Sequence, residues 1–382
     1  MNTKQKRIAV NVGGGYVPGL NAVITGVVLA ASELGWEVVG ICDGFEGLLF
    51  PENYPDGGLI PLIPQLIENI DLAGAILGTA VRNDPFHVRT INSDNLVEEV
   101  NKSDQLLETL RDNQIDGVIS IVGNRGLSIL YKLHRKGLKS ICIPRSVEND
   151  MATTMLSFGF NSALSFTTEM LDRARQAAHS ARKIAVVEVL GEQTGWLALQ
   201  SAIAVGADAV LIPEIPYDLP KVASKLQQKF NNGRSHGLVV VAEGAIDSQK
   251  SSNVTSSHPL KASLSPLATD HEGTHVIQKS GQAAQTVALG LQRLIDEETY
   301  PLVLSSWVKG GTLTAVDRQL GLGYGAAAVL ALQNDRNGVM VAFQPPDLKF
   351  VPLAEAINKV RTVPNDSELI QIARAIGICL GG

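Results

Sequence analysis

The sequence predicts an α/β protein built from doubly wound parallel sheets, and two observations lead to this prediction. Short runs rich in β-branched residues recur along the 382 residues, without the polar–apolar alternation of half-exposed strands. Amphipathic stretches of helical length separate most of these runs. Repeated strand–helix–strand order is typical of a parallel sheet with helices on both faces. At about 150 residues per domain, the length corresponds to roughly two or three domains.

The predicted elements follow from this pattern along the chain. Strands are expected where apolar runs are short and bounded by glycine or polar residues: 7–12, 37–42, 117–122, 140–143, 184–190, 209–212, 237–242, 301–306 and 339–343. Helices are expected where apolar residues recur at helical spacing: 20–34, 101–113, 127–136, 161–180, 196–205, 219–231, 280–296 and 316–333. Residues 249–269 are rich in Ser, Thr and Pro and predict a surface loop.

Composition excludes several classes of protein. A hydrophobic fraction of 45% with mixed charges excludes a mainly disordered chain. The net charge of −6 argues against a nucleic-acid partner, which requires a basic face. No apolar run reaches the ~18–20 residues of a membrane span, so no membrane partner is expected. Cys42, Cys142 and Cys379 form no CxxC pair, which argues against a disulfide framework and fits a reducing cytoplasm.

Two strand-to-helix junctions contain glycines suited to anion binding. Gly14 and Gly15 follow the first strand, and Gly123, Asn124 and Gly126 follow the strand at 117–122. Glycine lets the backbone approach an oxyanion, and the N-terminus of the following helix supplies N–H groups and a positive dipole end. Each junction alone is equally compatible with a tight turn.

Two further loops carry charged residues. Arg82, in the loop 77–86, could face a phosphate or lie in solvent. The loop 144–150 follows a strand and places Arg145 and Ser146 beside Glu148 and Asp150, which could hold a metal or abstract a proton, or form a solvated turn. All four junctions are expected at the carboxyl ends of early strands, where a doubly wound sheet has its crevice. This shared location favours a phosphate-handling site.

The motif from His271 to His275 matches the zinc hydrolase pattern H-E-x-x-H. It follows the Ser/Pro-rich loop, has a glycine inside the expected helix and lacks the extended metzincin spacing. We therefore expect no zinc site here.

In their order and spacing these motifs resemble the phosphofructokinase family, over essentially the whole chain. The matching segments are 14–21, 77–86, 123–127, 146–150, 188–196, 242–245, 304–318 and 363–378. The resemblance implies two doubly wound α/β domains of the phosphofructokinase type. One would bind the donor phosphate (1–160 with about 307–350), and the other the sugar phosphate (161–306 with about 351–382). It also implies a cytoplasmic, glycolytic transfer of a phosphoryl group from ATP or pyrophosphate to fructose 6-phosphate or a related sugar phosphate, with Mg²⁺.

The resemblance also assigns roles to residues of this chain. Glu148 would be the base, assisted by Arg145 and Arg125, and Asp150 the metal ligand. The residues that would bind the donor phosphate are Gly14, Gly15, Arg82, Gly123, Asn124 and Gly126. Those that would bind the sugar phosphate are Ser146, Lys183, Leu190, Gly191, Glu243 and Lys309. Oligomers complete the sugar site in the family, so a homo-oligomer (dimer or tetramer) or a hetero-oligomer with an active paralogue is expected.

Several positions depart from the family pattern. Arg125 replaces a metal-holding aspartate, and Glu148 replaces an aspartate base and is one methylene longer. A shift of about 1 Å can cost ~100-fold in rate. Tyr16 and Leu130 would crowd a nucleotide, and Glu192 replaces an arginine. Two functions therefore stay open: a phosphotransferase, and a catalytically impaired paralogue that binds a phosphometabolite or acts as a regulatory subunit.

Overall fold

The computed structural model describes residues 5–68, 70–80, 84–91, 96–251 and 280–382. The chain divides into two compact units. Unit 1 comprises Met1–Ser162 and Lys309–Arg361, and unit 2 comprises Ala163–Val308 and Thr362–Gly382. The last residues of unit 1 include the strand that ends at Pro352, which pairs within the sheet of that unit.

Unit 1 is built on a mixed sheet whose central strands are parallel. Its strand order is β14-β13-β7-β6-β1-β2-β3, and β8 pairs with β7. Only the edge strands β14 and β3 run antiparallel to their neighbours. The strands are β1 (Arg7–Val12), β2 (Glu37–Ile41), β3 (Leu59–Pro61), β6 (Gly117–Val122), β7 (Ser140–Ser146), β8 (Phe158–Gly159), β13 (Val339–Gln344) and β14 (Asp347–Pro352).

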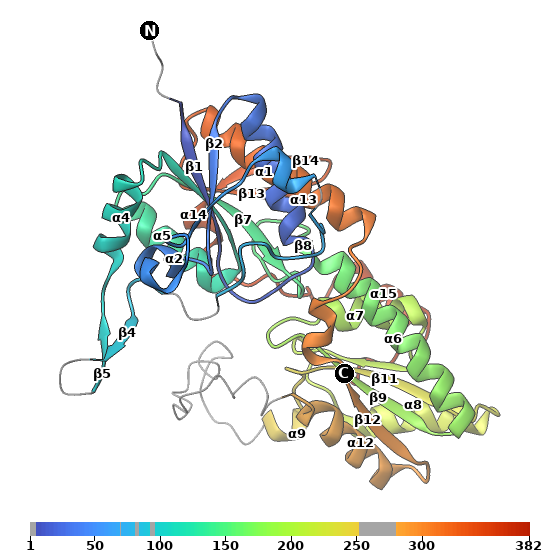
Figure 1. The fold of residues 1–382 in the computed structure, drawn as a ribbon. Coiled ribbons are helices and arrows are strands. Elements are labelled where there is room, and N and C mark those ends of the chain that lie inside the picture. The colour runs from blue at the N-terminus through green and yellow to red at the C-terminus, as the bar shows by residue number, and fades with distance from the viewer. Residues whose placement is uncertain (1–4, 69, 81–83, 92–95, 252–279) are drawn as a thin grey trace. The chain divides into compact units, whose positions relative to one another are not determined.

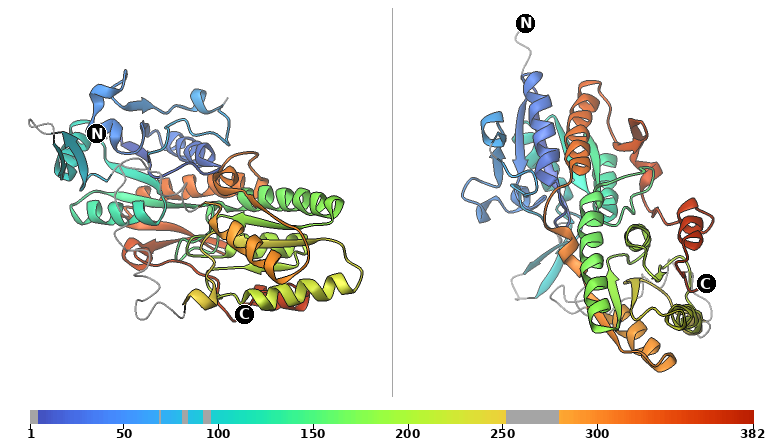
Figure 2. Two further views of the ribbon diagram at one scale, coloured as in Figure 1. Left: turned by 90° about the horizontal axis from the view of Figure 1, so that it is seen from below. Right: turned by 90° about the vertical axis from the view of Figure 1, so that its right-hand side faces the viewer.

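Helices cover both faces of this sheet. On one face, leucines of the helices α2, α4 and α5 pack on alternate strand residues such as Ala9 and Val118. Two other helices, α1 and α13, lie side by side, as the blue and orange helices in Figure 2 show. Their backbones approach closely at Gly26, where a Cβ would lie 2.2 Å from the Leu322 carbonyl oxygen. The helices of unit 1 are α1 (Leu20–Glu33), α2 (Glu46–Leu49), η1 (Pro51–Asn53), α3 (Pro64–Ile67), α4 (Ser103–Asp112), α5 (Asn124–Arg135), α13 (Ala315–Gln333) and α14 (Leu353–Ala356).

A small antiparallel hairpin of unit 1 stands apart from the main sheet (Figure 1). It consists of β4 (Val88–Ile91) and β5 (Val97–Val100). Arg89 pairs with Glu99 across the strands, with 3.7 Å between Nε and Oε1. Helix α6 (Phe160–Ala181) begins in unit 1 and continues into unit 2.

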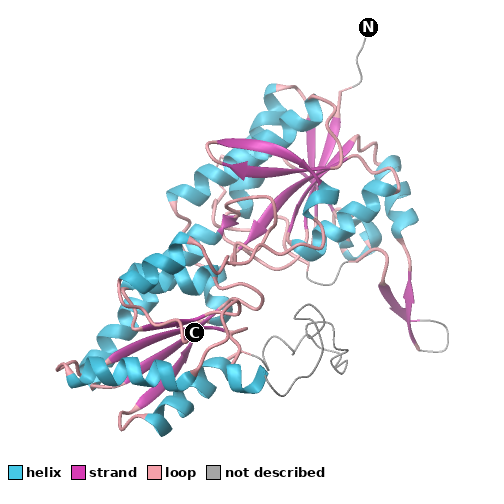
Figure 3. Cartoon of the chain, turned by 180° about the vertical axis from the view of Figure 1, so that it is seen from behind, coloured by secondary structure: helices cyan, strands magenta, loops and turns pink. Residues whose placement is uncertain are grey.

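Unit 2 has a smaller, wholly parallel sheet with the order β10-β11-β9-β12 (magenta in Figure 3). One face packs on apolar residues of α8 and α12, and α7 contacts β10 and β11. The strands are β9 (Ile184–Val189), β10 (Ala209–Leu211), β11 (Gly237–Ala242) and β12 (Thr299–Val303). The helices are α7 (Trp196–Val205), α8 (Leu219–Asn231), α9 (Ser248–Ser251), α12 (Gln282–Leu294), η2 (Ser305–Lys309) and α15 (Glu368–Ala375).

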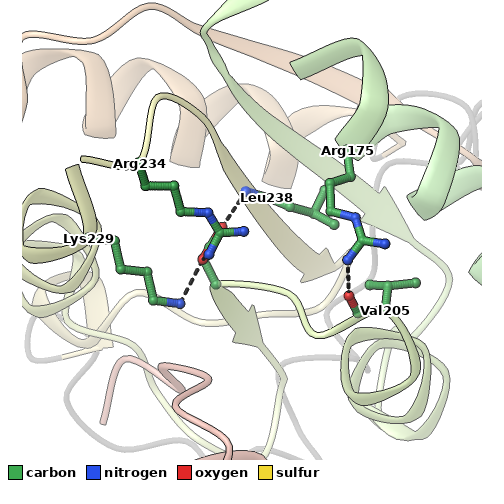
Figure 4. Close-up of polar contacts among 6 residues, drawn as sticks. Arg175, Val205, Lys229, Arg234 and Leu238 are labelled. Atoms are coloured by element: carbon green, nitrogen blue, oxygen red, sulfur yellow. Dashed lines mark hydrogen bonds and ion pairs between the residues drawn. The ribbon is translucent and has the colours of Figure 1, made fainter. Parts of the chain in front are cut away.

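A buried carboxylate at the amino end of β10 bonds residues of neighbouring segments. The Asp208 side chain is fully buried and accepts from Lys229 at 2.6 Å, from Arg234 at 2.8 Å and from the Leu238 backbone N–H at 2.8 Å (Figure 4). Because a buried charge is tolerated only when paired, the two cations let Asp208 hold β10 beside β11.

The two sheets confirm the predicted α/β class. The predicted bounds of β1, β6 and β11 agree with the structure, since these strands are almost wholly buried. Among the described residues, no helix has both the length and the apolar character that crossing a bilayer requires.

Candidate functional site

The glycine loop after β1 forms a cradle for the side chain of Arg145. Gly14 has φ +91°, and a Cβ built there would lie 1.7 Å from an Arg145 guanidinium nitrogen, so only glycine fits. Arg145 Nε donates to the Gly13 carbonyl at 2.9 Å. Burial lowers the pKa of Arg145 to about 10, and Asp150 opposes this shift. The guanidinium therefore stays charged at neutral pH, at the carboxyl ends of β1 and β7.

The second junction joins the first through Asp150. Gly123 is the N-cap of α5 and provides no side-chain cap, so the first N–H groups of this helix remain available to an anion. Asn124 Nδ2 donates to Asp150 Oδ2 at 2.7 Å, and Ser146 Oγ donates to Oδ1 at 2.5 Å. The structure thus brings the loops at residues 13–15, 123–126 and 144–150 together at one edge of the sheet of unit 1.

Glu148 lies in a loop with a constrained backbone. Its N–H donates to Ser146 Oγ at 3.1 Å. The next residue, Asn149, has φ +55° and is buried, and its side chain accepts from the Ser157 N–H at 3.0 Å and donates to the Met155 carbonyl at 3.1 Å. These bonds hold an unfavourable conformation and fix the position of the half-buried Glu148.

The described side chains do not by themselves form a preformed magnesium site. Both oxygens of Asp150 already accept hydrogen bonds, and Arg145 is close enough to influence the same carboxylate. Nowhere in the described part of the chain do three His, Cys, Asp or Glu side chains gather in a way that could hold a metal. Mg²⁺ is commonly held by one or two carboxylates together with water and the phosphates of a substrate, so a carboxylate of this loop would hold it only with a bound donor.

Other predicted residues of unit 1 have different outcomes. Arg125 is exposed at the start of α5, beside Asn124. Tyr16 is half-buried and donates from its hydroxyl to the Ala73 carbonyl. The expectation that Leu130 crowds a nucleotide is wrong, because this side chain is 1% exposed and belongs to the core between α5 and the sheet. Arg82 and the motif from His271 to His275 lie outside the described residues.

In unit 2, the structure brings together part of the predicted sugar site. Leu190 and Gly191 follow β9, and Glu243 follows β11, at the same edge of the parallel sheet. The Gly191 N–H donates to Glu243 Oε1 at 3.5 Å. Gly191 has φ +148°, and a Cβ there would lie 2.6 Å from the Thr194 carbonyl oxygen. The turn at 191–195 is therefore tightly closed, with Glu243 against its first residue.

The two predicted lysines lie elsewhere. Lys183 precedes β9, so it lies at the opposite edge from Gly191, where it forms an ion pair with Glu298. A six-residue strand spans about 20 Å, so Lys183 cannot join Gly191 and Glu243 within one chain. Lys309 ends η2, the short helix that follows β12, and is half-buried.

Two residues near the predicted loops escaped the sequence analysis. Arg361 bonds the loop that carries Glu148, with 3.2 Å from its guanidinium to the Asn149 carbonyl. Glu214 accepts from the Gly195 N–H at 3.0 Å, beside the turn that starts at Gly191. No local pattern marks Arg361, whereas Glu214 lies between two prolines directly after β10, a position that could have indicated a site.

Comparison with known proteins shows which family the chain belongs to. A family model described as Phosphofructokinase matches residues 7–332. The chain is 36% identical over 384 residues to the ATP-dependent 6-phosphofructokinase of Chloroflexus aurantiacus, covering 100% of this chain and 99% of that protein. It is 35% identical over 371 residues to the protein of the same name from Spirochaeta thermophila, covering 96% and 95%. The crystal structure of the pyrophosphate-dependent phosphofructokinase from Marinobacter aquaeolei has a TM-score of 0.74 at 18% identity, over 98% of this chain and 92% of that one, which concerns the fold alone. The chain therefore belongs to the phosphofructokinase family.

Proposed function

We propose that this protein is a phosphotransferase that transfers a phosphoryl group from ATP or pyrophosphate to fructose 6-phosphate or a related sugar phosphate. The observation that supports this most strongly is the position of Arg145, whose charged guanidinium lies above the glycine loop and whose backbone carbonyl lies near Gly123, the N-cap of α5. A cation and a helix N-terminus that converge on one place favour the charge of a phosphoryl group. In phosphoryl transfer, positioning and charge neutralisation provide most of the catalysis.

In this proposal, the residues at the sheet edge of unit 1 have different roles in the transfer. Gly14, Gly123 and the first turn of α5 bind the donor phosphate, and Arg145 neutralises charge that develops during transfer. Glu148 accepts the proton of the attacking sugar hydroxyl, which requires hydrogen-bond reach to that hydroxyl. Asp150 orients Ser146 and Asn124 through its two hydrogen bonds.

The sugar side of the proposal needs more than one copy of the chain. Gly191 and Glu243 offer a backbone turn and a carboxylate to sugar hydroxyls. Lys183 lies at the opposite strand ends and would serve the sugar phosphate only in a neighbouring copy, which supports an oligomer. We place the protein in the cytoplasm, in glycolysis, where free thiols such as Cys42, Cys142 and Cys379 are stable.

A coupled assay tests the proposal with ATP and pyrophosphate as donors, a panel of sugar phosphates as acceptors, and arms with Mg²⁺ or a chelator. We expect turnover of at least one donor–acceptor pair, and a loss of about 100-fold or more in Glu148→Gln, which removes the base. Glu169→Gln, on the exposed surface of α6, is the matched control and keeps wild-type turnover. No turnover with any pair would contradict the proposal.

A second candidate function is binding of a phosphometabolite without turnover, as a regulatory subunit. The exposed Arg125 beside Asn124 and the engagement of both Asp150 oxygens favour it, because they oppose metal binding. Calorimetry with pyrophosphate and fructose 6-phosphate distinguishes the two functions, since affinity without turnover supports the second. In that case, activity gained by the double variant Arg125→Asp/Glu148→Asp would show that only the chemistry was lost.

A further inference from the structure

One short segment contacts both loops that the proposed reaction uses. Residues 360–363 form the connection through which the chain leaves unit 1 after Arg361 and returns to unit 2 at Thr362. Within each unit, this segment bonds a different functional loop. We call these four residues the connecting strap.

In unit 1, the strap holds the loop that carries Glu148 and Asp150. Val360 forms an antiparallel bridge with Met151, and the Arg361 N–H donates to the Asp150 carbonyl at 2.8 Å. The Arg361 guanidinium donates to the Asn149 carbonyl at 3.2 Å. Burial lowers the pKa of Arg361. A hydrogen bond from a partly desolvated cation is stronger than one in water, so the strap restrains the backbone on either side of Asp150.

In unit 2, the strap holds the turn that follows Gly191. The Val363 N–H donates to Glu214 Oε1 at 2.8 Å. Both oxygens of the same carboxylate accept from the Gly195 N–H at 3.0 Å, and Gly195 is the N-cap of α7. The Glu214 carboxylate therefore accepts hydrogen bonds both from the N-terminus of α7 and from the connecting strap.

We propose that the connecting strap couples the two loops, with Arg361 and Glu214 as positioning residues for the transfer. The inference rests on the proposed function, because it assumes that Glu148 acts as the base and the turn 191–195 binds the sugar. Misplacing a reacting group by about 1 Å can cost ~100-fold in rate. Arg361 should thus act on the chemical step, and Glu214 on sugar binding. Since one covalent segment carries both contacts, sugar binding and order in the loop at 146–151 should be linked reciprocally.

Steady-state kinetics provide the first test. In Arg361→Ala we expect kcat to fall by about 10-fold to 100-fold with the KM of the sugar phosphate within threefold, and Arg361→Lys to recover most of kcat. In Glu214→Gln we expect this KM to rise about 10-fold. Arg374→Ala, an exposed arginine on α15, is the control and should match wild type. A kcat for Arg361→Ala within threefold of wild type would overturn the inference.

The double variant Arg361→Ala/Glu214→Gln tests the coupling itself. If both residues act through one strap, the loss in kcat/KM of the double variant should be at least threefold smaller than the product of the two single losses. If the loss in kcat/KM of the double variant equals the product of the two single losses, the two residues act independently, and the proposed coupling is wrong. The thermal midpoints of all variants distinguish a loss of positioning from a loss of folding. If the loss in kcat disappears at a lower temperature, at which the variant is fully folded, this result also contradicts the positioning role.

Hydrogen–deuterium exchange tests the strap without relying on turnover. We expect Arg361→Ala to accelerate exchange of the amides at 147–151 by about 10-fold or more, and fructose 6-phosphate to slow the same amides in wild type but not in Glu214→Gln. Unchanged exchange at 147–151 in Arg361→Ala would overturn the inference. If the wild type turns over no donor–acceptor pair, the proposed function is wrong. Hydrogen–deuterium exchange at 147–151 then still tests whether the connecting strap restrains this loop.

Discussion

At the scale of single residues, the candidate site depends on the side chain of Arg145. This side chain fits against Gly14 only because glycine has no side chain. Family resemblance assigned Gly14 to the donor phosphate and Arg145 to the assistance of the base, but it could not predict that Arg145 occupies the space above Gly14. That relation joins residues 131 positions apart (145 minus 14) and arises only when β1 and β7 meet the same sheet edge. Arg361 escaped prediction for the same reason, since its partners are backbone carbonyls distant in sequence.

Adjacent glycines allow a matched test of this fit. Gly14→Ala places a methyl group against the Arg145 guanidinium at positive φ, so we expect the free energy of unfolding to fall by about 1–3 kcal/mol. Gly15→Ala meets no atom within 4 Å and has no positive φ, so its unfolding free energy should stay within about 0.5 kcal/mol of wild type. Urea denaturation measures both, and equal destabilisation would contradict the fit.

At the scale of elements, burial determines which bounds the sequence could predict. β1, β6 and β11 are short, mostly apolar runs without polar–apolar alternation, because helices cover them on both faces. The bounds of β12 were misplaced, at 301–306 rather than Thr299–Val303, because it is a half-exposed edge strand. β14 and β3, the edge strands of unit 1, and the hairpin of β4 and β5 were missed, since their exposed residues obscure the apolar pattern.

The start of α13 supplies a prediction about pH. Asp317, in its first turn, is fully buried and accepts from the Ser162 N–H at 2.6 Å. Burial raises the pKa of Asp317 above 3.8, so the folded state retains a proton that the unfolded chain releases. The corresponding stability is present below pH 3.8 and is lost as pH rises through the higher, folded-state pKa.

Asp317→Asn removes this titration. We therefore expect its unfolding free energy, relative to wild type, to increase between pH 4 and pH 7, as followed by urea denaturation at intermediate pH values. Asp366→Asn, at an exposed position, serves as the control and should track wild type at each pH. If the unfolding free energies of Asp317→Asn and wild type changed with pH in parallel, burial of this carboxyl group would not be the cause of the pH dependence.

At the scale of the whole molecule, strand direction distributes the predicted sugar ligands over two sheet edges. The sequence placed Lys183 and Gly191 eight positions apart (191 minus 183), and family resemblance assigned both to one ligand. Because β9 lies between them in extended form, one chain cannot bring them together. Family resemblance thus predicted the chemistry of the ligands, whereas the topology places Lys183 and Gly191 at opposite ends of β9, so the proposed sugar-phosphate role of Lys183 calls for a second copy.

Complementation between two variants tests this requirement. Lys183→Ala and Glu243→Gln should each lose most activity as pure proteins. When the two are refolded together, mixed oligomers contain sites in which both native residues meet, so part of the wild-type activity, about a quarter of it, should return. Activity of the mixture equal to the average of the separate variants would indicate that every site is built within one chain.

The interrupted course of unit 1 also constrains its biosynthesis. β7 ends at Ser146, yet its neighbour β13 is not complete until Gln344, after all of the sheet of unit 2 has been synthesised. At ribosomal rates of ~5–20 residues per second, the 198 intervening positions (344 minus 146) leave that flank of β7 without its strand for roughly 10–40 s. The nascent chain thus carries an open strand edge throughout this interval, and chaperones that shield such edges should associate with ribosomes while they translate residues 146–344.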